Sequence, residues 1–134
     1  MTRHSLRIAS FAAALLLQVS AFAHHSFTAE FDAKKSVTLK GTVAKVMWTN
    51  PHAHIKVDVK DDAGKVTTWD FELGSPNGLI RRGWSAHTLK VGDVVTVTGY
   101  LARDGSPLAN ARVIQLADGR EVFAGSSAED AATR

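Results

Sequence analysis

Apolar and polar residues alternate along much of the chain between residues 37 and 123, which predicts a β protein. In residues 52–60, the apolar residues Ala53, Ile55, Val57 and Val59 alternate with polar ones. Because successive side chains of a strand point to opposite faces, this pattern is typical of a half-buried strand. Comparable patterns predict strands at residues 37–48, 66–73, 94–101 and 111–116, and a short last strand at residues 121–123.

The first of these strands changes its pattern partway along. Val37 and Val43 share one parity, whereas Val46 and Trp48 have the other. A change of parity within one strand indicates a β-bulge, where one extra residue is inserted. Gly41 marks a position where the strand is expected to bend.

One short helix is expected between the third and fourth strands. Ser75 can cap it, Pro76 suits its first position and Gly83 can end it. Three strands, a helix and two strands follow the order of an OB-fold barrel. We therefore expect an all-β fold with one short helix, a five-stranded OB-like barrel whose end is covered by Leu79, Ile80 and Trp84. An ordinary β-sandwich is the alternative.

The first 23 residues have the features of a secretory signal peptide. A basic start is followed by an apolar run at residues 8–19 and by Ala21 and Ala23, the small residues that a signal peptidase requires. The run is too short to span a bilayer well. Cleavage after Ala23 predicts a soluble periplasmic protein with a single OB-like domain at residues 24–124. An N-terminal arm is expected at residues 24–36, and a disordered tail at residues 125–134.

Charge and cysteine content narrow the possible functions. The leader holds two of the 16 Lys and Arg residues and none of the 13 Asp and Glu residues, so the net charge falls from +3 to +1 after cleavage. A nearly neutral protein is not typical of nucleic-acid binding. The absence of cysteine excludes disulfides, thiolate catalysis and thiolate metal sites. The sequence leaves the partner, a small ligand or another exported protein, unidentified.

Several short motifs are distributed over nearly the whole chain after the leader. They are His24–Phe27, Trp48–His52, Gly74–Pro76, Arg82–Trp84, Leu89–Asp93 and Arg103–Gly105. Together they resemble a family of small exported bacterial proteins that is catalogued as a domain of unknown function. The resemblance implies an exported single-domain protein and assigns no catalytic residue.

The histidines are the strongest candidates for chemistry. His52 and His54 are two residues apart in a strand, so their side chains share a face. The apolar residues Ile55, Val57 and Val59 are expected on the opposite, inner face, so the histidines point outward. If the turn to the next strand is centred on Ala63, His54 lies opposite Glu72. The Glu72 carboxylate is then expected to orient the imidazole, as carboxylates do beside metal-binding histidines.

Copper is the one cofactor that this pattern suggests. Cleavage after Ala23 would leave His24 with a free α-amine next to His25. The amine loses its proton at a pKa of about 7.7–8.0, and Cu(II) favours sites rich in nitrogen donors. We therefore take His24, His25, His52 and His54 as candidate Cu(II) ligands. The alternative is that the first pair belongs to an ordinary arm and the second to an ordinary surface.

The remaining candidates favour a binding protein over an enzyme. Trp69 and Trp84 are expected in the core, which leaves Trp48 as a possible ligand contact. Asp70 and Glu72 form a carboxylate pair, but Lys56 lies opposite Asp70 in the expected register, so a salt-bridged surface is expected there. The serines have no identifiable base. The alternative function is a metal-free module that binds a protein, peptide or saccharide partner.

Overall fold

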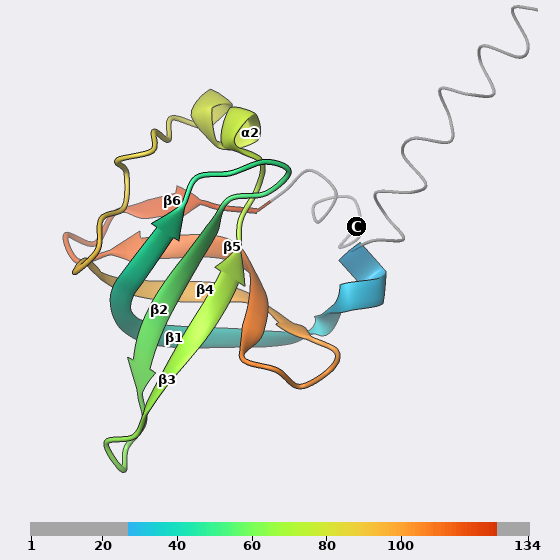
Figure 1. Cartoon of the computed structure of the whole chain (residues 1–134), viewed down its shortest axis with the longest axis vertical. Helices are drawn as coiled ribbons and strands as arrows, with labels where there is room; N and C mark the ends of the chain where they lie inside the picture. The colour runs from blue at the N-terminus through green and yellow to red at the C-terminus, as the bar shows by residue number, and fades with distance from the viewer. Residues whose placement is uncertain (1–26, 126–134) are drawn as a thin grey trace, which may run out of the picture.

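The computed structural model describes residues 27–125 (Figure 1). After a helical turn at residues 27–30 come the elements β1 (Phe31–Met47), β2 (His54–Lys60), β3 (Val66–Glu72), α2 (Pro76–Arg81), β4 (Val94–Ala102), β5 (Leu108–Leu116) and β6 (Glu121–Phe123). The expected leader, the start of the arm and all but the first residue of the expected tail lie outside the described residues. Within residues 27–125, no helix is long and apolar enough to cross a membrane.

The strands form one sheet that closes into a barrel. Their order is β3-β2-β1-β4-β5-β6, and β3 also pairs with β5. This β3–β5 seam is parallel and joins Asp70, Phe71 and Glu72 to Leu108, Ala109 and Asn110. It closes a ring that consists of β1 to β5. Along the chain, α2 lies between β3 and β4. The predicted OB-like barrel is therefore confirmed.

Two strands begin earlier than their sequence patterns indicated. β1 starts at Phe31, not at residue 37, so part of the expected arm belongs to the barrel. Phe31 pairs with Ala102, and regular pairing with β4 resumes at Ser36 after an irregular stretch. The intervening residues are mostly polar and do not alternate, so the pattern could not reveal them. β5 likewise begins at Leu108 instead of residue 111.

The predicted bulge lies near the C-terminal end of β1. Val43 pairs with Val57, but the next pair is Lys45 with Lys56, so Ala44 is the inserted residue. A side chain at Gly41 would collide with the carbonyl oxygen of Asp58 on β2. Glycine is therefore required where β1 bends closely over its neighbour.

The helix covers one end of the barrel. Ser75 Oγ accepts a hydrogen bond from the backbone N–H of Gly78 at 3.1 Å, and Pro76 occupies the first turn, as predicted. Leu79 is fully buried, and Trp84 is 5% exposed and donates from Nε1 to the carbonyl of Phe123 at 2.9 Å. The prediction that Ile80 packs inward is wrong, because it is 54% exposed. In a helix of six residues only a narrow stripe can face the barrel, and Leu79 lies on it.

A second apolar cluster fixes the start of the described chain to the side of the barrel. Phe27 and Phe31 are buried against Ala102, with Tyr100 packed beside them. Arg103 donates from Nε to the carbonyl of Thr28 at 2.7 Å. The helical turn at residues 27–30 is therefore held beside the loop between β4 and β5.

Candidate histidine–carboxylate site

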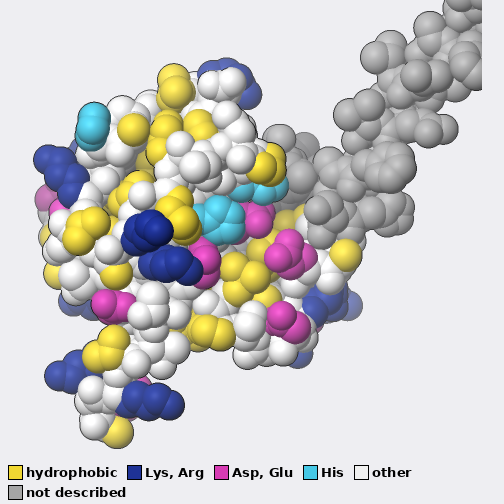
Figure 2. Space-filling model, viewed as in Figure 1, with side chains coloured by type: hydrophobic (Ala, Val, Ile, Leu, Met, Phe, Trp, Pro, Cys, Tyr) yellow, Lys and Arg dark blue, Asp and Glu magenta, His cyan; other side chains and the backbone are white. Residues whose placement is uncertain are grey.

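The pairing of β2 with β3 sets up the candidate site. His54 lies opposite Glu72, and Lys56 lies opposite Asp70, which is the predicted register. Ile55 is buried inside the barrel. Its neighbours in β2, His54 and Lys56, therefore point outward. Figure 2 shows histidine and acidic side chains next to one another in the middle of this face. We call His52, His54, Asp70 and Glu72 the histidine–carboxylate face.

The side chains of this face pair diagonally. His54 Nδ1 is hydrogen-bonded to Asp70 Oδ1 at 2.8 Å, and His52 Nδ1 lies 3.2 Å from Glu72 Oε1. The carboxylate that contacts His54 is thus that of Asp70, although Glu72 lies directly opposite in the backbone register. Strand side chains lean along the strand, so the nearest carboxylate can be one pair away.

Asp70 stays ionised because two basic side chains surround it. Partial burial works against ionisation, but hydrogen bonds from His54 and Lys56 outweigh it and hold the pKa of Asp70 below its ordinary value. Lys56 Nζ lies 3.0 Å from Asp70 Oδ2. The two carboxylate oxygens of Asp70 therefore have different partners: Oδ2 contacts Lys56, and Oδ1 is hydrogen-bonded to the His54 ring.

Glu72 has the more buried setting, at the β3–β5 seam. Its burial raises its pKa, the nearby His52 lowers it in part, and the carboxylate of Glu30 raises it further. Asn110, which is 1% exposed, donates from Nδ2 to Glu72 Oε1 at 3.2 Å. Within the described chain, Asn110 Oδ1 is buried without a hydrogen-bond partner.

Asn110 is a neighbour of the candidate site that the sequence pattern did not reveal. The available signal was a lone polar residue between Ala109 and Ala111 in a strand. Alternation alone could not show that this residue meets Glu72, because the two strands are far apart in sequence and pair only across the seam.

The arrangement of the imidazoles has a chemical consequence. When Nδ1 carries the proton that faces a carboxylate, Nε2 keeps its lone pair and can bind a metal. His54 fits this description through its hydrogen bond, and His52 through its contact with Glu72. Among residues 27–125, however, no three His, Asp or Glu side chains are placed to hold a metal ion together. The face offers two ligands, so a site would need a third from another part of the chain.

The other predicted ligands, His24 and His25, lie outside the described residues. The described residues begin at Phe27, three residues after His24. Glu30, in the helical turn that begins there, acts electrostatically on Glu72. Glu30 is therefore within electrostatic range of the histidine–carboxylate face.

Trp48 has a mainly structural environment. Its side chain is half-buried and packs against the barrel core, as does that of Trp69. The crevice that it borders with His54 and Trp84 has a volume of about 10 Å³. This is no larger than the space that one water molecule requires. A saccharide ring would therefore have to stack on the exposed part of the Trp48 ring.

The fold and this face define a small OB-fold protein with a histidine–carboxylate surface on β2 and β3. The chain belongs to the family of unknown function DUF6152, whose model matches residues 13–110. This match confirms the resemblance to a family of unknown function. A comparison with curated proteins gave no significant match. Among solved structures, the chain is similar to the mitochondrial single-stranded DNA binding protein Rim1 from S. cerevisiae, with a TM-score of 0.49 and 9% identity over 62% of this chain and 93% of that chain.

Proposed function

We propose that this protein is an exported module that binds Cu(II) through an N-terminal histidine together with His52 and His54. The observation that carries the proposal is the contact of each strand histidine with a carboxylate through Nδ1. Such contacts fix the ring orientation and leave Nε2 available. Two oriented imidazoles on one outer face are a good start for a nitrogen-rich copper site.

The third and fourth donors come from the N-terminus in this proposal. Cleavage after Ala23 gives His24 a free amine and an imidazole on one residue. Both can bind the same Cu(II) ion as neutral nitrogen donors. The helical turn at residues 27–30, held by Arg103, supports this arrangement because its Glu30 already influences Glu72. His25 supplies a further imidazole in the same segment.

We infer a binding role and a periplasmic location, not catalysis. The hydroxyls of Ser75 and Ser85 accept hydrogen bonds from backbone N–H groups, and that of Ser106 donates to Asp104. These contacts serve a helix cap and turns and do not activate a nucleophile. The leader at residues 1–23 supports export.

The test uses protein secreted into the periplasm and purified without added metal. Intact mass locates the N-terminus, and Cu(II) affinity is measured by competition with a chelator. We expect a protein that begins at His24 and binds one equivalent of Cu(II). The double variant His52→Ala/His54→Ala should bind at least about 100-fold more weakly, since changes even to groups behind the ligands cost 10- to 100-fold.

His87→Ala is the matched control, because His87 is exposed and lies outside the histidine–carboxylate face. It should leave the affinity unchanged. A mature N-terminus elsewhere, or equal affinity in the double variant, would overturn the copper site. A metal-free module that captures a partner would then be the better description, and Trp48→Ala would be the variant to examine.

A further inference from the structure

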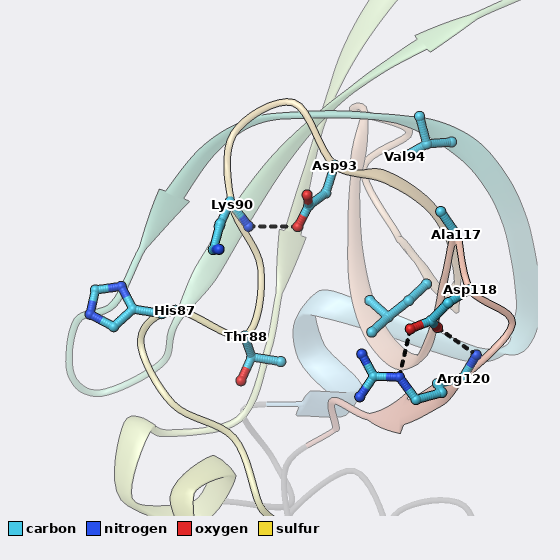
Figure 3. Close-up of a pocket in the computed structure, with 9 residues that line it drawn as sticks. His87, Thr88, Lys90, Asp93, Val94, Ala117, Asp118 and Arg120 are labelled. Atoms are coloured by element: carbon cyan, nitrogen blue, oxygen red, sulfur yellow. Dashed lines mark hydrogen bonds and ion pairs between the residues drawn. The ribbon is translucent and has the colours of Figure 1, made fainter.

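A surface groove, separate from the histidine–carboxylate face, lies on other elements of the barrel. It has a volume of about 320 Å³ and is formed by the segment before β4 and by the turn between β5 and β6 (Figure 3). That volume is at the lower end of the range for small-molecule pockets. Leu116, Ala117 and Val94 supply its apolar lining.

The two carboxylates that line this groove are engaged by its own turns. Asp118 accepts from the backbone N–H of Arg120 at 3.0 Å through Oδ1 and from Arg120 Nε at 2.7 Å through Oδ2. Asp93 Oδ2 accepts from the backbone N–H of Lys90 at 2.8 Å. These contacts fix the shape of both turns and occupy three of the four carboxylate oxygens.

The polar groups that remain are mostly donors. Within the described chain, the Lys90 ammonium, the Arg120 Nη atoms and the His87 imidazole have no hydrogen-bond partner. Thr88 Oγ1 accepts from the backbone N–H of Ser85, so its hydroxyl proton is still available. Figure 3 shows Lys90 and Thr88 on one side of the groove and Arg120 on the other, with the His87 ring on the outer side of the same loop as Thr88. A ligand that complements them must supply acceptors.

We propose that this groove binds a small organic carboxylate. The carboxylate lies between Lys90 and Arg120, whose N–H groups form charge-assisted hydrogen bonds with it. The apolar part of the ligand covers Leu116, which gives an organic acid an advantage over an inorganic anion. The site is independent of copper binding, because it uses different residues and different elements.

Sodium benzoate is the probe, and the readout is a ¹H–¹⁵N NMR titration of the full mature protein. We expect saturable shifts in the amides of residues 87–94 and 116–120. Lys90→Gln and Arg120→Gln should each weaken binding by about tenfold or more, since a hydrogen bond to a charged group is worth that much. Lys65→Gln, which makes the same charge change in the β2–β3 turn, should leave the affinity unchanged.

Two further probes decide the chemistry. Benzamide keeps the ring without the charge, and inorganic phosphate keeps the charge without the ring, so both should bind more weakly than benzoate. Equal binding of benzamide would overturn the role of the two cations, and equal binding of phosphate would overturn the role of the apolar lining. Absence of saturable shifts with benzoate, or equal affinity in the variants, would overturn the site.

Discussion

Asn110 on β5 donates a hydrogen bond to Glu72 on β3 across the only parallel pairing among the described strands. The contact links closure of the barrel to the histidine–carboxylate face, because the same Glu72 oxygen lies beside His52. A substitution of Asn110 should therefore change both the stability of the fold and the electrostatics of the histidine–carboxylate face.

Asn110→Asp tests this link through its pH dependence. The change places a second buried carboxylate beside Glu72, and each carboxylate raises the other's pKa above its unfolded value. The penalty is present at neutral pH and is lost as the pH falls and the pair takes up protons. We expect the variant to lose about 2 kcal/mol or more of unfolding free energy at pH 7.5 and much less at pH 4, measured by urea denaturation.

Gln115→Glu is the control for this variant. It makes the same charge change on the same strand but at an exposed position. It should change the unfolding free energy by about 0.5 kcal/mol or less at either pH. Equal losses in the two variants would mean that the Asn110 position is not special.

Asp70→Asn tests the orientation of His54. The amide keeps the shape but loses the charge that attracts His54 and Lys56. Because the pKa of Asp70 is lowered in the folded protein, its stabilising effect is present above its ordinary pKa and disappears as the pH falls through the lowered value. We expect a loss of about 0.5–1 kcal/mol at pH 7 that disappears in acid, once the pH is below the lowered pKa of Asp70.

The same variant makes a prediction about copper. If Nε2 of His54 binds Cu(II), loss of the carboxylate behind the ring should weaken affinity by about tenfold. Asp58→Asn is the control, since Asp58 lies on the same strand pair and accepts a hydrogen bond from Thr68. An equal effect of the two changes would point to general electrostatics in place of ring orientation.

Gly41→Ala tests the bend of β1. The added methyl group would meet the Asp58 carbonyl oxygen, so the strands would have to separate locally. We expect a loss of about 2 kcal/mol or more in unfolding free energy, which is in the range for overpacking. Thr42→Ala, at the next and exposed position, should cost much less, and both are measured by thermal and urea unfolding.

Arg103→Ala tests how firmly the start of the described chain is held. The variant removes the hydrogen bond to the Thr28 carbonyl and the charge contact of Arg103 with Asp32 at 3.7 Å. Global stability should fall by about 1 kcal/mol or less, whereas amide exchange at residues 28–32 should become faster. Unchanged exchange there would show that Phe27 and Phe31 hold the segment without Arg103.

The sequence was informative wherever an alternating pattern or a turn fixed the geometry. The register of His54 with Glu72 followed from the position of one turn, and the presence of a bulge in β1 followed from a change of parity in the alternating pattern. The choice of Asp70 as the partner of His54 did not follow, because it depends on how side chains lean along the strand.

Features that join distant segments were beyond the pattern. Phe31 and Ser36 pair with β4 on either side of an irregular polar stretch, Ile80 lies on the outer side of a very short helix, and Asn110 meets Glu72 only after the ring closes. The groove near Lys90 and Arg120 likewise depends on two turns whose approach is set by the whole barrel. Such relationships arise from tertiary closure, and local propensity does not encode them.

The β3–β5 seam joins three residue pairs, and the β1–β4 ladder joins eight. Unzipping the short seam would convert the ring into an open curved sheet while the long ladder stays intact. The least costly large fluctuation of this barrel is therefore expected at the seam. Glu72 and Asn110 would separate in that fluctuation. A ligand bound at Glu72 and its neighbours would make the opening rarer. Ligand binding could then be followed as slower hydrogen exchange of the backbone amides at the seam.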